Sequence, residues 1–340
     1  MGFVPIFDLH ADVFMDLVRR GSGPELEARH LRRMRAGGIA GAGLIDCRMA
    51  GESSEPGDFE RFIRTVRLEL EAAGDRVLVA KTAADLDKVF LAAQGLDDSG
   101  DSGDSGGARR PAPFAVVVGY EGLNPALGDL SWIERLHREA HVRIAAITHN
   151  NDNPFGAGAL GASGPEGPRG LTELGCAAVA KMNELGILID MAHASPQTRK
   201  DVLAASTRPV MLSHTSAKAV YDNGRNLDDR EMRAIADRGG LLGCMTSPAA
   251  LAPLEDRNNH SLGRYMAHLA HMIDAAGVEH VGLGMHFCEY LYTEEQYPPV
   301  RGLEDASKAQ AILDALRGLG YSEGDIEKIA FRNFLRVFAG

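Results

Sequence analysis

The sequence has few cysteines, and no two of them form a Cys-x-x-Cys pair. Cys47, Cys176, Cys244 and Cys288 are the four thiols, and long stretches of chain separate them. Such spacing argues against a disulfide framework, which small secreted proteins use to supplement a small core. We therefore expect reduced thiols and a cytoplasmic protein.

Long apolar runs and an excess of basic charge are lacking too. No run of 18 apolar residues occurs, so we expect no membrane span. Neither end shows the pattern of a signal peptide or a lipid anchor. The net charge of −11 argues against a nucleic-acid partner and against an anionic membrane surface.

Short apolar segments recur along all 340 residues and alternate with amphipathic stretches. Eight segments are rich in Val, Ile, Leu or Ala, as buried parallel strands are; they cover residues 4–9, 39–46, 114–120, 142–148, 187–191, 209–213, 241–245 and 281–285. Helical spacing appears between them, and one further apolar run, 77–80, is extra. The alternation predicts an α/β fold, a (β/α)₈ TIM barrel that forms a single domain over residues 1–340.

Two segments read as loops. Residues 97–113 repeat Asp-Ser-Gly and cannot bury apolar surface, so we expect a solvated, flexible loop before the third strand. Residues 153–169 are rich in Gly and Pro and follow the fourth strand, on the side expected to be catalytic. We expect this second loop to form a lid or a pocket wall.

Polar side chains follow the expected strands at the point where each strand ends. His10 and Asp12 follow the first strand and, being two apart, face the same way in an extended chain. Glu121 follows the third strand, where a carboxylate could bridge two cations. Imidazole nitrogen and carboxylate oxygen are good zinc ligands, although each motif alone is a weak signal.

Four histidines follow later strands in the same manner. His149, His193, His214 and His286 come after strands four, five, six and eight. The carboxyl ends of the strands meet at one rim of a (β/α)₈ barrel, where active sites lie, so we expect these side chains to cluster. The other histidines lie in helices, in loops or at the opposite rim, and we assign them structural roles; they are His30, His137, His141, His260, His268, His271 and His280.

Taken together, the motifs resemble the membrane (renal) dipeptidase family, peptidase family M19 of the amidohydrolase superfamily. The resemblance spans residues 8–333 and rests on motifs that are highly specific only jointly. They are His10-x-Asp12, Tyr120-Glu121-Gly122, Thr148-His149-Asn150, Gly170-Leu171-Thr172, Met191-Ala192-His193-Ala194-Ser195, Ser213-His214-Thr215 and Arg225-Asn226-Leu227-Asp228-Asp229.

The resemblance implies a binuclear zinc hydrolase. His10 and Asp12 would bind one Zn²⁺, His193 and His214 would bind the other, and Glu121 would bridge both together with a water or hydroxide. His149 would polarise the scissile carbonyl or hold the tetrahedral intermediate. Arg225 would bind the carboxylate of the substrate, a bidentate task suited to a guanidinium. The family also implies a homodimer.

The sequence departs from the family after the eighth strand. Gly284-Met285-His286-Phe287-Cys288-Glu289 stands where the family carries a Gly-Ser-Asp-Phe-Asp-Gly-like segment, so His286 replaces the aspartate that handles the proton. His286 could act as the proton shuttle, add a nitrogen ligand to a metal, or leave the site catalytically weak.

The expected function is therefore a zinc-dependent dipeptidase acting on small amides that carry a carboxylate. Two alternatives stay open: a divergent enzyme that hydrolyses a lactam, a lactone or a metabolite conjugate, and a metal-binding homologue with weak catalysis.

Overall fold

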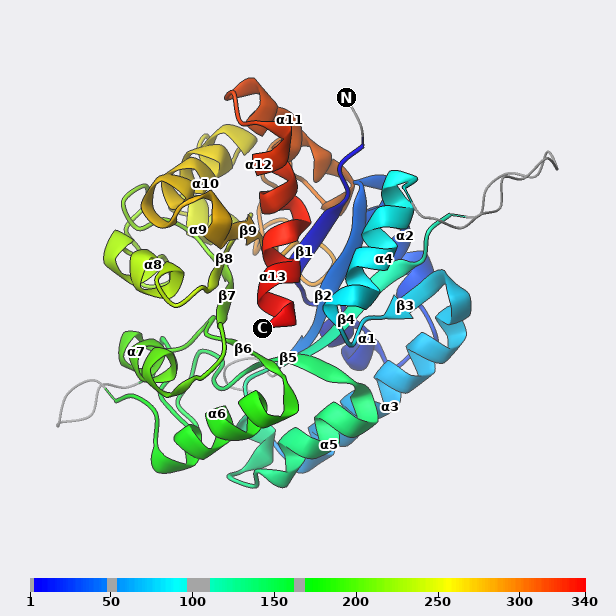
Figure 1. Ribbon diagram of the computed structural model, residues 1–340, viewed down its shortest axis with the longest axis vertical. Coiled ribbons are helices and arrows are strands. Elements are labelled where there is room, and N and C mark those ends of the chain that lie inside the picture. The colour runs from blue at the N-terminus through cyan, green and yellow to red at the C-terminus, as the bar shows by residue number, and fades with distance from the viewer. Residues whose placement is uncertain (1–2, 48–53, 97–110, 162–168) are drawn as a thin grey trace.

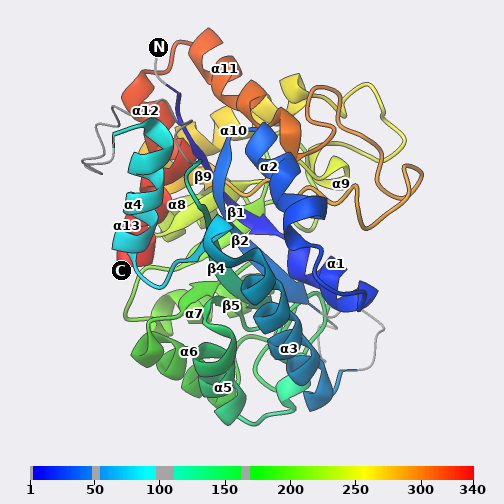
Figure 2. The ribbon, with the colours of Figure 1, turned by 90° about the vertical axis from the view of Figure 1, so that its right-hand side faces the viewer.

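A computed structural model describes residues 3–47, 54–96, 111–161 and 169–340. Its strands form one parallel sheet in the order β1-β2-β4-β5-β6-β7-β8-β9, curved into a nearly closed barrel (Figures 1 and 2). The strands are β1 (Ile6–Ala11), β2 (Ile39–Cys47), β3 (Val77–Val79), β4 (Phe114–Glu121), β5 (Val142–Ala146), β6 (Leu188–Asp190), β7 (Met211–Thr215), β8 (Leu241–Cys244) and β9 (Val281–Leu283). The expected (β/α)₈ fold is confirmed.

Hydrogen bonds just beyond β9 bring the two ends of the barrel sheet together. The backbone N–H of His286 donates to the carbonyl of His10 over 3.2 Å. The N–H of Met285 donates to the carboxylate of Asp8 over 2.9 Å. This contact places the segment after β9 directly beside the end of β1.

Helices surround the barrel, as Figure 1 shows. They are α1 (Val13–Arg20), α2 (Arg32–Ala36), α3 (Pro56–Ala73), α4 (Ala83–Gln94), α5 (Ser131–Ala140), α6 (Glu173–Leu185), α7 (Pro196–Ala205), α8 (Asp229–Ala236), α9 (Pro248–Leu251), α10 (Leu262–Ala276), α11 (Gln310–Gly318), α12 (Glu323–Glu327) and α13 (Asn333–Ala339). Short 3₁₀ or π turns also occur at η1 (Leu26–Leu31), η2 (Gly74–Arg76), η3 (Asn124–Ala126), η4 (Val278–His280), η5 (Ala306–Lys308) and η6 (Lys328–Arg332). Several helices begin at a Ser, Thr or Asp side chain that accepts a backbone N–H, as Thr172 does for α6.

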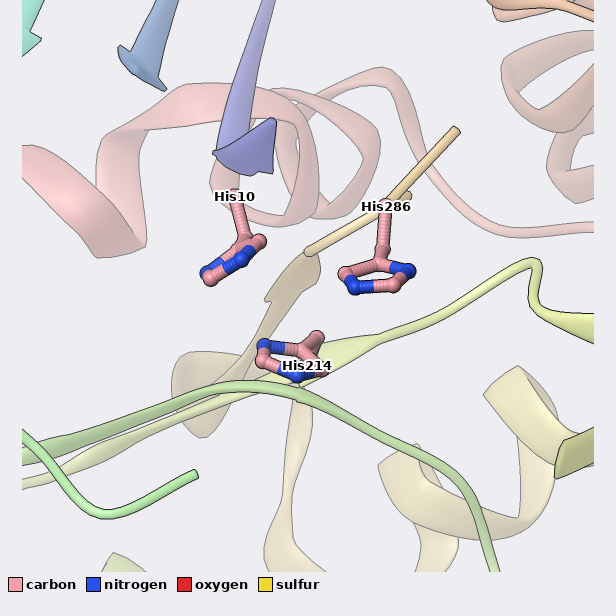
Figure 3. A group of neighbouring side chains, drawn as sticks. All are labelled: His10, His214 and His286. Carbon is pink, nitrogen blue, oxygen red and sulfur yellow. The ribbon is translucent and has the colours of Figure 1, made fainter. Parts of the chain in front are cut away.

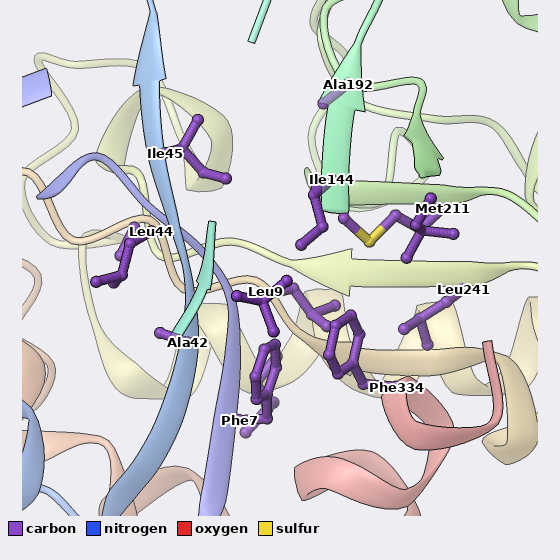
Figure 4. Packing of buried hydrophobic residues seen from close by; sticks show 14 of the residues in the cluster. Phe7, Leu9, Ala42, Leu44, Ile45, Ile144, Ala192, Met211, Leu241 and Phe334 are labelled. Atoms are coloured by element: carbon purple, nitrogen blue, oxygen red, sulfur yellow. The ribbon is translucent and has the colours of Figure 1, made fainter. Parts of the chain in front are cut away.

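Aliphatic and aromatic side chains fill the core (Figure 4). The ring of Phe7 on β1 stacks on Phe334 of α13, with centroids 3.9 Å apart. The ring of Phe90 on α4 stacks on Phe331, with centroids 4.6 Å apart. Close packing of this kind holds the strands at fixed positions, so the rim that carries the polar side chains is rigid.

The extra apolar run at 77–80 is also a strand. It forms β3, which pairs with the start of β4 outside the barrel path. Of the two expected loops, 97–113 lies outside the described residues except for 111–113, and 162–168 of the second loop lies outside them too. No helix in the described part of the chain combines the length and the apolarity needed to cross a membrane.

Candidate metal centre

The polar residues expected at the strand ends do meet at one rim of the barrel. His10 is the residue before the last one of strand β1, Asp12 stands at the N-cap position of α1, and Glu121 is the final residue of β4. His193 follows β6 and His214 lies on β7. All five side chains are buried. Four sequence segments that are far apart in the chain, or separated by a helix, thus converge on one buried cluster.

One half of this cluster is built around His10. Its Nε2 lies 3.2 Å from Oδ1 of Asp12, and its Nδ1 lies 3.1 Å from the hydroxyl of Ser213. Ligand atoms of His10, Glu121, Asp190 and His214 all lie within 4.8 Å of one another. Imidazole nitrogen and carboxylate oxygen at this spacing form a set of donors that suits a divalent cation.

The other half is built around His193. Its Nε2 lies 2.9 Å from Nε2 of His214 and 3.4 Å from Oε1 of Glu121. On the far side of the same carboxylate, Nε2 of His149 lies 3.7 Å from Oε2 of Glu121. Glu121 therefore presents one oxygen toward His193 and the other toward His149, and it also belongs to the group of ligand atoms around His10.

Burial controls the charges in this cluster. It lowers the pKa of His193 well below the ordinary value, and nearby Arg225 adds to the effect. It also lowers the pKa of His214, helped by His10 and His286. Burial raises the pKa of Glu121 to about 8. Neutral imidazoles with free lone pairs are the form in which histidine binds a metal.

The pKa of His10 moves the other way. Burial lowers it, but the hydrogen bond to Asp12 and the charge of Glu121 outweigh burial and raise it to about 9. For Asp12, burial raises the pKa, but His286 and His10 outweigh burial and lower it. The buried carboxylates thus attract positive charge, whether a proton or a cation.

The cluster fits a cation in its unsatisfied atoms as well. Oε1 of Glu121 is buried and accepts no hydrogen bond from the described residues. The Nε2 atoms of His193 and His214 face each other over 2.9 Å, and both turn a lone pair to a cation when the proton of each neutral ring is on Nδ1. A buried unsatisfied acceptor is costly, and a divalent cation beside Glu121 would satisfy it.

Arg225 lies over the His193 half of the cluster. Its Nη1 lies 3.1 Å from Oδ1 of Asn150 and 2.7 Å from Nδ1 of His193, and its Nη2 lies 3.3 Å from Nε2 of His214. Burial lowers the pKa of this guanidinium to about 10, so it stays positively charged at neutral pH. A charged, planar fork beside the metal ligands suits a carboxylate.

A pocket of about 350 Å³ opens above these residues. Arg225, His193, His214 and His286 line its polar side, and Leu160, Met245, Ala249 and Ala250 are among its apolar walls. Leu160 belongs to the Gly- and Pro-rich stretch expected to form a pocket wall, so the described part of that stretch does reach the pocket. The pocket has the size of a small ligand.

His286 completes the ring of imidazoles. Figure 3 shows the rings of His10, His214 and His286 turned toward one another, and the His214 and His286 rings stack with centroids 4.6 Å apart. Nε2 of His286 lies 3.3 Å from Oδ2 of Asp12. Burial lowers the pKa of His286 to about 4, against the charge of Asp12, so this ring is neutral at pH 7.

A comparison with known families decides which family this site belongs to. The profile of the membrane dipeptidase family, peptidase family M19, matches residues 1–340.

The chain belongs to the membrane dipeptidase family.

Two relatives with similar sequences are named dipeptidases. The chain is 31% identical over 229 residues to Dipeptidase aclJ of Aspergillus oryzae, a match to 67% of this chain and 51% of the relative. It is 29% identical over 270 residues to Dipeptidase verJ of Clonostachys rogersoniana, which is 79% of this chain and 61% of that relative. The matches thus span about half to three fifths of the relatives' length. The expected classification as a metallo-dipeptidase of this family agrees with these names.

Solved structures of two metallo peptidases share the fold. A metallo peptidase described as dipeptidase AC of family M19 superposes with a TM-score of 0.81 at 23% identity, over 99% of this chain and all (100%) of that chain. A metallo peptidase from Rhodobacter sphaeroides, bound to a phosphinate mimic of the dipeptide L-Ala-D-Ala, gives 0.79 at 22% identity over 99% of both chains.

Sequence reasoning missed several residues that this membrane dipeptidase site uses. Asp190, the last residue of β6, accepts the backbone N–H groups of Ala192 and Ser213, each over 2.9 Å. Asn150 accepts from Arg225 and contacts His193, and Ser213 contacts His10. Asp190 is a lone carboxylate at the end of an apolar strand, and Asn150 and Ser213 stand beside His149 and His214 in two of the family motifs, without an assigned role. Asn150 and Ser213 act through their partners, which sequence spacing does not reveal.

Proposed function

We propose that this protein is a dipeptidase that binds two zinc ions, one between His10, Asp12 and Glu121 and the other between His193, His214 and Glu121. The observation that carries the proposal is the position of Glu121, which lies 3.4 Å from Nε2 of His193 and also shares a group of ligand atoms within 4.8 Å of one another with His10 and His214. Bound cations of this kind lower the pKa of water and polarise a carbonyl group, which supplies a nucleophile near neutral pH.

The protein's own residues would position the substrate. Arg225 presents its charged guanidinium to the pocket and would bind the carboxylate at the end of a dipeptide through two parallel hydrogen bonds. This contact would place the amide bond over the ligands of the proposed metal pair, because Arg225 touches His193 and His214 directly. The carboxylate would thus be the feature by which the enzyme selects its substrates.

His149 would act on the scissile carbonyl. Burial, together with the charge of Arg225, lowers the pKa of His149 to about 4, so its ring is neutral at pH 7. A neutral imidazole carries one N–H group that can donate to an oxygen on which negative charge develops. A preorganised donor of this type is worth about 2.7–4 kcal/mol in the transition state.

The test combines metal analysis with hydrolysis of a panel of L,L- and L,D-dipeptides. Purified protein should contain about two zinc ions per chain and should lose activity on chelation, with recovery when zinc is returned. Glu121→Gln should bind less metal and lose at least about a hundredfold in kcat, because an amide cannot bridge two cations as a carboxylate does.

Glu69→Gln is the matched control for that substitution. Glu69 is also a buried glutamate, but it accepts backbone N–H groups of residues 25 and 26, away from the metal centre. This variant should keep its metal and its activity. Absence of bound metal, together with no hydrolysis of any dipeptide in added zinc, would refute the proposal. The homodimer expected from the family stays a prediction that sedimentation would test.

His286 keeps the second candidate function open. A site that lacks the family's aspartate could act on a lactam, a lactone or a metabolite conjugate, or could bind metal with weak catalysis. If the protein hydrolyses no dipeptide and His286→Asp gains that activity, the weakly catalytic reading is favoured. If a non-peptide substrate turns over far better than every dipeptide, the divergent enzyme is favoured.

A further inference from the structure

The segment after β9 brings a thiol to the outer side of Asp12. Sγ of Cys288 lies 3.6 Å from Oδ2 of Asp12 and 3.3 Å from Nδ1 of His286. The same Oδ2 lies 3.3 Å from Nε2 of His286. The other oxygen of Asp12, Oδ1, faces His10. Asp12 therefore has one oxygen directed to each of two neighbouring groups of donors.

These distances match the edges of a small coordination shell. Zinc lies about 2.0–2.2 Å from nitrogen and oxygen ligands and about 2.3 Å from sulfur, so neighbouring ligands of a tetrahedral ion lie roughly 3.3–3.6 Å apart. Nε2 of His286 lies 3.3 Å from Oδ2 of Asp12 and 4.0 Å from Sγ of Cys288, and Sγ lies 3.6 Å from Oδ2, so the three atoms are close to these spacings. Cys288 and Asp12 are buried, and His286 is partly buried.

The backbone holds His286 in a conformation that costs energy. Its φ is +55°, in the left-handed region, and the one other metal-centre residue in that region is His193 at +63°, among the described residues. The carbonyl of His286 accepts the hydroxyl of Tyr297 over 3.1 Å, and its N–H donates to His10 over 3.2 Å. Contacts on both sides therefore hold the imidazole toward Asp12, and strain of this kind gathers at functional sites.

We propose that Asp12, His286 and Cys288 form an additional cation site with a thiolate ligand, which shares Asp12 with the proposed zinc pair. Binding releases the thiol proton to solvent and forms a sulfur–metal bond. Nitrogen and thiolate ligands select zinc and cobalt over magnesium, calcium and manganese. His286 then donates a lone pair to a metal, which is a different task from the proton transfer of the aspartate it replaces.

Cobalt(II) substitution tests the thiolate directly, because sulfur bound to cobalt gives a charge-transfer band in the near ultraviolet that nitrogen and oxygen ligands do not give. The protein loaded with Co²⁺ alone should show this band. Cys288→Ser should lose it, and His286→Ala should weaken it. Cys176→Ser, which removes an exposed thiol on α6, is the matched control and should leave the band unchanged.

Cys47 is the competing source of sulfur. Its thiol belongs to a group with Glu121 and His149 whose ligand atoms lie within 4.8 Å of one another. A band that persists in Cys288→Ser and disappears in Cys47→Ser would overturn the assignment. A band that persists in Cys47→Ser and disappears in Cys288→Ser would support it.

A second measurement needs no variant and therefore does not depend on how a variant folds. X-ray absorption at the zinc edge of the wild-type protein should show a sulfur scatterer at about 2.3 Å. Zinc bound through nitrogen and oxygen alone would refute the thiolate site and would leave the proposed zinc pair intact. Protein that binds no zinc at all would refute both proposals.

Discussion

At the scale of single residues, the chemistry of this protein depends on side chains that burial has modified. Burial lowers the pKa of His149, His193 and His286 and raises that of Glu121. The common result is a set of neutral imidazoles around carboxylates that need a positive partner. His10 and Arg225 are the exceptions, because the pKa of His10 is raised to about 9 and Arg225 stays charged at neutral pH and faces the pocket.

Replacing Arg225 by Lys should separate recognition from catalysis. Lysine keeps the positive charge but loses the planar fork that pairs with both oxygens of a carboxylate. We expect KM for a dipeptide to rise by about tenfold or more, equivalent to about 1.4 kcal/mol, with a much smaller change in kcat. Steady-state kinetics on the dipeptide and on its C-terminal carboxamide would measure the effect.

Wild-type enzyme should prefer the free acid to the carboxamide, and Arg225→Lys should reduce that preference. Arg199→Lys, in which the arginine pairs with Glu231 outside the pocket, is the control and should behave as the wild type does. An unchanged preference in Arg225→Lys would mean that another group binds the carboxylate.

At the scale of elements, helix α10 is tied to the barrel rim by one buried histidine. The N–H of Ala217, which follows β7, donates to Nδ1 of His268 over 3.1 Å. Nδ1 is therefore unprotonated, and the N–H at Nε2 donates to the carbonyl of Leu251 over 3.1 Å. Both hydrogen bonds together require the neutral ring, so protonation would break the contact with Ala217.

This arrangement predicts a loss of stability in acid. Burial lowers the pKa of His268 to about 4, below the value of 6.5 for an exposed histidine. As the pH falls from about 6.5 toward 4, the unfolded chain takes up this proton and the folded chain does not, so the free energy of unfolding falls by up to about 3 kcal/mol. Above pH 6.5 the contribution is constant.

Denaturant unfolding of wild type and His268→Gln between pH 7 and pH 4 would measure this loss of unfolding free energy in acid. A glutamine amide can accept from Ala217 and donate to Leu251 without titrating, so the variant should lose less stability in acid than the wild type. Parallel curves for wild type and His268→Gln would show that His268 does not supply the acid sensitivity.

The elements also show what sequence can and cannot predict. Strand positions and the rim residues follow from apolar runs that end in a polar side chain, as Val-Gly-Tyr-Glu121 does at the end of β4. The pairing of Cys288 with Asp12 was not predicted, because it depends on the closure of the barrel between β9 and β1. The contact of Asn150 with Arg225 was not predicted either, because the two residues lie 75 positions apart in the sequence.

At the scale of the whole molecule, the barrel serves to bring distant ligands together. Residues from β1 to the segment after β9 meet at one rim, and a packed core beneath them leaves little freedom to move. Cation binding in turn would link these segments, so the metals would stabilise the fold that positions them.

Anomalous diffraction from crystals of the zinc-loaded protein tests this account most directly. It predicts two strong peaks about 3.5–4 Å apart, on either side of Glu121, with His10 and Asp12 at one peak and His193 and His214 at the other, and a further peak beside Cys288 where the additional site binds zinc. A single peak, or no pair of peaks that Glu121 contacts, would contradict it.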